Sequence, residues 1–147
     1  MAGRIVVGVD GSDHGAAALR WATAEARLRG ATLVALHAWT FVPPPPLGAP
    51  DLLAVPVGDV AGDLEAERSA AQRVLDAALA DGAGGVAVEP RLVEGDAAEA
   101  LVDGAADADL VVVGTRGHGG LKSALLGSVS HHVIQHAPCP VVVVRSA

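Results

Sequence analysis

Short apolar runs alternate along this chain with longer amphipathic segments, and this alternation limits the possible fold more than any other feature. Five of the runs have the length and the β-branched content of buried strands, namely residues 4–10, 32–39, 86–93, 109–114 and 140–145. Segments with a helical period separate them, near residues 13–29, 63–79, 97–107 and 128–136. Strands that alternate with helices predict an α/β fold, a doubly wound parallel sheet of five strands with helices on both faces.

The size and composition of the chain favour one closely packed unit. Its 147 residues suffice for a single core, so we expect one domain over residues 1–147. Hydrophobic residues make up 51% of the chain but aromatic residues only 2%, so the core is built mainly from alanine and valine. Such small side chains favour close contact between the helices and the sheet.

Net charge and cysteine content indicate which kinds of binding partner and which cellular compartment to expect. Asp and Glu outnumber Lys and Arg by 17 to 10, and the net charge of -7 disfavours nucleic acid and anionic lipid as partners. The single cysteine, Cys139, excludes an intramolecular disulfide and favours a reducing compartment, where we expect an inert, buried thiol. The start of the sequence lacks the pattern of a secretory signal, and the apolar runs are too short to span a bilayer. We therefore expect a cytoplasmic protein.

Several residues mark where the helices begin and end. Ser12 or Asp13 can cap the first helix, Gly30 can end it, and Asp96 can cap the third. Within the first helix a polar stripe is predicted apart from the apolar face, formed by Arg20, Thr23 and Arg27. The connection over residues 41–59 contains a proline run at residues 43–46, which favours a surface connection over a polyproline ligand for an aromatic-lined partner domain.

A glycine-rich loop joins the fourth predicted strand to the last predicted helix. Gly114 is followed after two residues by Gly117 and, after nine more, by Gly127 and Ser128. Glycines allow a backbone to approach a ligand closely, and the N–H groups of a helix start attract anions. We expect N–H donors from Gly127, Ser128 and Val129, and hydroxyl donors from Ser128 and Ser130. The loop therefore predicts a phosphate-binding site, whereas a tight turn with a helix cap is the alternative.

Two better-known nucleotide motifs are absent from the sequence. No Gly-x-x-x-x-Gly-Lys-Ser/Thr stretch occurs, and no Gly-x-Gly-x-x-Gly follows the first strand. The loop instead resembles the Gly-x2-Gly-x9-Gly-Ser signature of the ATP-binding branch of the universal stress protein family. The resemblance extends to Ile-Val-Val-Gly-Val-Asp-Gly-Ser at residues 5–12 and to residues 131–145. It implies the strand order 3-2-1-4-5, with Mg-ATP bound between strands one and four.

The resemblance also implies roles for individual residues. Asp10 and Val9 would contact the nucleoside, and Asp10 could also hold magnesium, with a helix-capping carboxylate as its alternative role. Ala38 would offer its backbone to adenine, and Val113 and Gly114 would line the ribose. The triphosphate would be held by Gly117, Gly127, Ser128, Val129 and Ser130. From its position in the loop, Arg116 could reach the same anion.

No catalytic group accompanies the predicted phosphate loop, so we expect a binding protein and at most slow ATP hydrolysis. His132 and His136 are four residues apart but lack an evident third ligand, so no zinc site is predicted. We expect a nucleotide-dependent stress or signalling module with an unknown protein partner. A nucleotide-independent dimeric adaptor and a cyclic AMP-binding protein are the alternatives. The apolar strand at Val141–Val144 would leave an open edge, which the homodimer usual in the family would cover.

Overall fold

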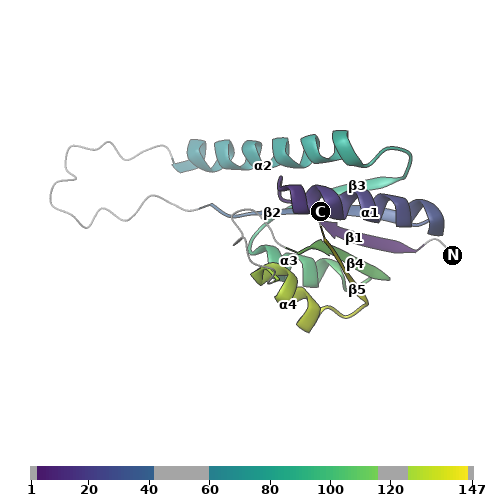
Figure 1. Cartoon of the computed structure of the whole chain (residues 1–147). Coiled ribbons are helices and arrows are strands. Elements are labelled where there is room, and N and C mark those ends of the chain that lie inside the picture. Colours follow the sequence, from purple (N-terminus) through teal and green to yellow (C-terminus); the bar gives the residue numbers. More distant parts are fainter. Residues whose placement is uncertain (1–2, 42–59, 116–125, 146–147) are drawn as a thin grey trace, which may run out of the picture.

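The computed structural model describes residues 3–41, 60–115 and 126–145. A central sheet lies between two pairs of helices (Figure 1). In chain order the described elements are β1 (Arg4–Gly8), α1 (Asp13–Arg29), β2 (Thr32–Trp39), α2 (Val60–Gly82), β3 (Val88–Glu94), α3 (Ala97–Gly104), β4 (Leu110–Gly114), α4 (Ser128–His136) and β5 (Val141–Val144). Helices α1 and α2 cover one face of the sheet, and α3 and α4 cover the other (Figure 1).

The sheet has five parallel strands in the order β3-β2-β1-β4-β5, which confirms the predicted order. Strand β1 lies at the centre, and its Ile5 is opposite Leu33 of β2 and Leu110 of β4. The chain winds outward from β1 in one direction through β2 and β3, then crosses back to β4 and β5 on the other side. In such sheets the point where the winding reverses leaves a crevice at the carboxyl ends of the strands.

The core has two halves, one on each face of the sheet. Because side chains alternate along a strand, Ile5 and Val7 of β1 face α1 and α2, whereas Val6 faces α3 and α4. Fully burying each of these side chains stabilises the fold by roughly 1.5–3 kcal/mol. Three of the innermost positions of α1 are alanines, which allow the helix to lie close to the sheet: Ala18, Ala22 and Ala26.

The helix ends follow the signals in the sequence. Ser12 caps α1 by accepting a hydrogen bond from the Gly15 N–H at 3.0 Å, and Gly30 ends that helix with a positive φ of 64°. Asp96 caps α3 by accepting from the Glu99 N–H at 3.1 Å. These caps confirm the predicted starts of α1 and α3 and the predicted end of α1. Each could be predicted because it depends on residues within one helical turn.

The predicted polar stripe on α1 is wrong at Thr23. Its side chain is buried, and its hydroxyl donates to the Leu19 carbonyl at 2.7 Å and to the Gly82 carbonyl at 3.0 Å. The second bond arises because α2 runs on to Gly82, beyond the predicted end near residue 79, and Gly82 packs against Leu19 of α1. A polar residue of α1 is thus enclosed by the end of its neighbouring helix.

Some boundaries differ from those predicted. Strand β1 ends at Gly8, two residues earlier than expected, and α3 ends at Gly104 instead of near residue 107. The connection that contains the proline run lies outside the described residues from residue 42 to residue 59. Among the helices that the structure describes, none is long and apolar enough to cross a membrane.

Candidate functional site

A small crevice lies where the winding of the sheet reverses, at the carboxyl ends of β1 and β4. Its volume is about 70 Å³. Several of its lining residues were not predicted as site residues, among them Gly15, Leu36 and Leu101. The crevice also brings together six residues that the sequence predicted: Val9, Asp10, Val113, Gly114, Val129 and Ser130. Residues from distant parts of the chain therefore converge at the predicted place.

The turn between β1 and α1 fixes one wall of the crevice. Asp10 Oδ1 accepts hydrogen bonds from the Ser12 N–H at 2.9 Å and from the Ser12 hydroxyl at 2.5 Å. Gly11 adopts a positive φ of 82°, which the turn requires. Ser12 itself caps α1, so Asp10 orients the capping residue instead of capping the helix directly. A Cβ at Gly15 would lie 2.7 Å from Asp10 Oδ1, so glycine is needed to keep this carboxylate in place.

Hydrogen bonds also join the two described ends of the glycine-rich loop. The Ser130 hydroxyl is buried and donates to the Gly114 carbonyl at 2.6 Å. The Gly127 N–H donates to the Thr115 carbonyl at 2.7 Å. Two groups expected to face phosphates are thus engaged within the chain in this structure. The N–H groups of Ser128 and Val129 begin α4, and Val129 lines the crevice.

The N-terminus of α4 has no acceptor of its own. Its capping residue is Gly127, which makes no side-chain hydrogen bond, and no acidic residue occurs in the first turn. The partial positive charge of a helix start is therefore not balanced by a carboxylate on the first turn of α4. This arrangement suits an anionic ligand.

The end of β4 is packed against the first turn of α1. A Cβ at Gly114 would lie 2.7 Å from the His14 carbonyl oxygen, and Thr115 Oγ1 lies 3.3 Å from His14 Nδ1. The absent side chain at Gly114 is therefore required by contact within the protein, whereas the sequence suggested only a close approach to a ligand. His14 carried no recognisable signal in the sequence.

The end of β2 is joined by two hydrogen bonds to Val9, which lines the crevice. Val9 donates its N–H to the Leu36 carbonyl at 2.9 Å, and His37 Nδ1 donates to the Val9 carbonyl at 2.8 Å. Ala38, predicted to contact adenine, follows His37 in β2. It lies two residues beyond Leu36 and is not itself among the residues that line the crevice. The contact between His37 and Val9 could not be foreseen from the sequence.

Other predicted features fall outside the crevice or outside the described residues. Arg116 and Gly117 belong to residues 116–125, which the structure does not describe. His132 and His136 stack with a ring-centroid distance of 4.2 Å. In the described part of the chain, no three His, Cys, Asp or Glu side chains are grouped so as to hold a metal ion. Cys139 is only partly buried, and this burial, with the Asp109 carboxylate, raises the pKa of its thiol.

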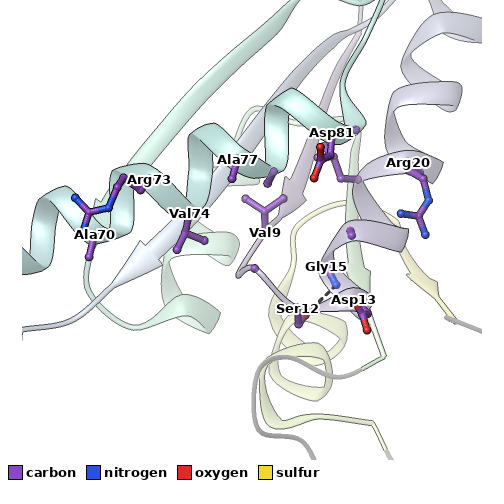
Figure 2. Close-up of a pocket in the computed structure, with 15 residues that line it drawn as sticks. Val9, Ser12, Asp13, Gly15, Arg20, Ala70, Arg73, Val74, Ala77 and Asp81 are labelled. Atoms are coloured by element: carbon purple, nitrogen blue, oxygen red, sulfur yellow. Dashed lines mark hydrogen bonds between the residues drawn. The ribbon is translucent and has the colours of Figure 1, made fainter.

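A larger hollow of about 530 Å³ lies between α1 and α2 on the other face of the sheet. Figure 2 shows Val9 between α2, which contributes Val74 and Ala77, and the start of α1. Its charged residues, such as Arg20 and Arg73, are exposed side chains on the two helices. The crevice is much smaller, but backbone donors and glycines converge on it. We therefore take the crevice as the candidate site.

Comparison with known proteins identifies one family model and several relatives with similar sequences. Residues 1–145 match the family model described as the Universal stress protein family. A universal stress protein of Thermus aquaticus is 40% identical over 144 residues, covering 96% of this chain and 97% of the relative. A universal stress protein of Mycobacterium tuberculosis is also 40% identical, but the match spans 97% of this chain and only 45% of that longer protein.

Two solved structures of similar proteins contain nucleotides. A universal stress protein in complex with cAMP has a TM-score of 0.61 and 28% identity, with 99% of this chain and 98% of that chain covered. The universal stress protein from Archaeoglobus fulgidus in complex with dAMP has a TM-score of 0.54 and 26% identity, with 95% of each chain covered.

Proposed function

Because the chain belongs to the universal stress protein family, we propose that it binds ATP with magnesium in the crevice between β1 and β4. One observation carries the proposal: six residues predicted from the sequence to surround a nucleotide line a single crevice at the switch point of the sheet. Open parallel sheets bind their ligands at this location. Val9, Asp10, Ala38 and Val113 would contact the nucleoside.

The phosphates would lie at the start of α4. The N–H groups of Ser128 and Val129 and the hydroxyl of Ser128 are the donors there, and the Gly127 cap leaves room for an anion. An anion at such a helix start gains about 0.3–1 kcal/mol per charge, and up to roughly 2 kcal/mol when partly buried. Arg116 and Gly117 would complete this part of the site.

Asp10 fits the metal that accompanies ATP. Magnesium is usually held by one or two carboxylates together with phosphate oxygens and water, so a single aspartate at the crevice is compatible with it. The crevice volume of about 70 Å³ is below the roughly 300–1,000 Å³ of typical ligand pockets. The nucleotide would therefore extend beyond the crevice, with only part of it enclosed.

The bound nucleotide would act as a signal and not as a substrate. We infer a binding module in the cytoplasm whose ATP occupancy alters what the protein contacts during stress, with at most slow hydrolysis. Cyclic AMP is the second candidate ligand, because a similar structure contains it. The Gly-x2-Gly-x9-Gly-Ser loop favours ATP, since its length suits several phosphates. A nucleotide-independent adaptor is the remaining alternative.

We also propose that two copies associate through β5. Within the described part of the chain this strand pairs with β4 alone, and all four valines of Val141–Val144 are partly exposed. An apolar strand at the edge of a sheet exposes unpaired backbone groups, which a second copy would cover. Sedimentation velocity tests this, because a monomer at micromolar concentration would contradict it.

The first experiment identifies any nucleotide released from freshly purified, denatured protein by mass spectrometry. Titration of the emptied protein with ATP and with cyclic AMP, each with and without magnesium, then gives the two affinities. ATP that co-purifies or binds more tightly supports the proposal, and tighter cyclic AMP favours the second candidate. If neither nucleotide binds, the nucleotide-independent adaptor is favoured instead.

Gly127→Val tests where the phosphates lie. The branched side chain would fill the space at the start of α4, so we expect ATP binding to be lost while the dimer persists. Gly84→Val is a matched control, because nothing lies within 4 Å of a Cβ at this exposed glycine. Unchanged ATP affinity in Gly127→Val would contradict the assignment of this phosphate site.

A further inference from the structure

The direction of the backbone groups at the end of β2 follows from its neighbours. In a parallel strand, alternate residues direct their N–H and C=O groups to the same side. The Leu36 carbonyl accepts from the Val9 N–H, so the backbone N–H and C=O of Leu36 point towards β1. The Trp39 carbonyl accepts from the Gly95 N–H, so the backbone groups of Trp39 point towards β3. The backbone N–H and C=O of Ala38 therefore point to the same side as those of Leu36, towards the end of β1.

The regular ladder between β1 and β2 stops where the crevice begins. Continued pairing would join the Val9 carbonyl to the Ala38 N–H. The Val9 carbonyl instead accepts from His37 Nδ1 at 2.8 Å, and β1 ends at Gly8 while β2 continues to Trp39. Because a carbonyl can only accept, His37 Nδ1 carries a proton. An imidazole thus occupies the place of a backbone donor.

We propose that His37 is a positioning residue that determines base selectivity: by occupying the Val9 carbonyl it leaves the Ala38 N–H and C=O available to the edge of a base. This inference rests on the proposed nucleotide site. Adenine presents a ring acceptor beside an amino donor on its pairing edge, whereas guanine presents a donor beside an acceptor. A donor and acceptor fixed on Ala38 can therefore distinguish the two, since the wrong base leaves polar groups unpaired.

His37 also holds Val9 in place. Val9 lines the crevice, and both its N–H and its carbonyl are bonded to β2, through Leu36 and His37. Without the imidazole, the Val9 carbonyl would lose its donor, and the Ala38 N–H is the nearest replacement along the ladder. Closing that bond would withdraw the donor from the ligand.

The binding test compares wild type with His37→Phe and His37→Asn. Phenylalanine keeps a flat ring without a donor, whereas the asparagine amide can donate from near the position of Nδ1. For His37→Phe we expect ATP to bind about tenfold more weakly, the loss of about one hydrogen bond. Its preference for ATP over GTP should also largely disappear, while inorganic tripolyphosphate binds as in wild type. His37→Asn should retain the preference. An unchanged ATP-to-GTP ratio in His37→Phe would overturn the proposal.

Amide exchange followed by NMR tests the same idea without any nucleotide. In the free wild type the Ala38 amide should exchange much faster than that of Val34, which lies within the ladder. In His37→Phe the Ala38 amide should become protected, while protection of Val34 reports that the fold is intact. A slowly exchanging Ala38 amide in free wild type overturns the inference, even if the variant fails to fold. Failure of the wild-type protein to bind ATP would instead contradict the proposed function.

Discussion

The N-termini of α1 and α4 lie at the same crevice but are built differently. Each helix follows a central strand, β1 or β4. Helix α1 is closed by its own chain, because Ser12 accepts from the Gly15 N–H and Asp13 lies in the first turn. Helix α4 begins after Gly127, with neither a side-chain cap nor an acidic residue in its first turn. Helix α1 is thus capped by a side chain of its own chain, whereas in the proposed function the start of α4 would bind the phosphates of the ligand.

This difference separates stability from binding within one site. A capped helix start contributes to folding whether or not a ligand is present, and α3, capped by Asp96, is of this kind. An uncapped start forgoes that stability and keeps its partial positive charge for an incoming anion. Substitutions that add or remove caps should therefore have opposite consequences at α4 and at α1.

The largest effect is expected when α4 receives a charged cap. Gly127→Asp would supply the acceptor that the helix lacks and place a negative charge where the phosphates would bind. Gly127→Asn is the matched control, since it fills the same space and offers a cap without the charge. We expect Gly127→Asp to bind ATP on the order of 100-fold more weakly than Gly127→Asn, because like charges a few ångströms apart repel strongly. Calorimetric titration measures both, and equal affinities in the two variants would contradict the comparison.

Removing the cap of α1 should instead affect stability. Ser12→Ala loses the acceptor for the Gly15 N–H and the donor to Asp10, and we expect a loss of about 1 kcal/mol in the free energy of unfolding. Tripolyphosphate should bind as in wild type, because α4 is unchanged. Urea unfolding measures the loss, and Ser12→Thr, which keeps the hydroxyl, should restore most of it. A stable Ser12→Ala that binds tripolyphosphate poorly would reverse the assignment.

The smallest effect is expected at α3. Asp96→Ala removes a cap that is exposed to solvent, where water can replace the lost acceptor, so about 0.5 kcal/mol of stability should be lost. Asp96→Ser keeps an acceptor and should lie close to wild type. Neither variant should change ATP affinity, since the Asp96 carboxylate bonds the Glu99 N–H. Altered nucleotide binding in Asp96→Ala would show that caps and binding are not separable.

The helix ends could be predicted from the sequence because each is decided locally. Ser12, Gly30 and Asp96 act within one turn of their own helix, and the sheet order followed from the family resemblance. Thr23 was misassigned because its burial depends on the end of α2, which lies 59 residues further along the chain. A helical period shows which residues share a face but not which helix will cover them.

The site was predictable in its position but less so in its contacts. Its strand ends and the glycine-rich loop could be recognised, and six of the expected residues meet in the crevice. The bonds from His37 to Val9 and from Ser130 to Gly114 connect a side chain to a backbone carbonyl in another part of the chain. Such pairs leave no periodic pattern, so the sequence did not indicate them.

The pairing of β1 with β4 has a consequence for how the protein folds during its synthesis. Ile5 lies beside Leu110, and the hydrogen bond from the Arg4 N–H to Asp109 spans 105 positions. A ribosome makes β1, α1 and β2 long before β4, so one edge of the central strand must wait unpaired while most of the chain is synthesised. The crevice cannot exist during that interval. Under the proposed function, bound nucleotide would therefore stabilise only the completed fold and not the growing chain.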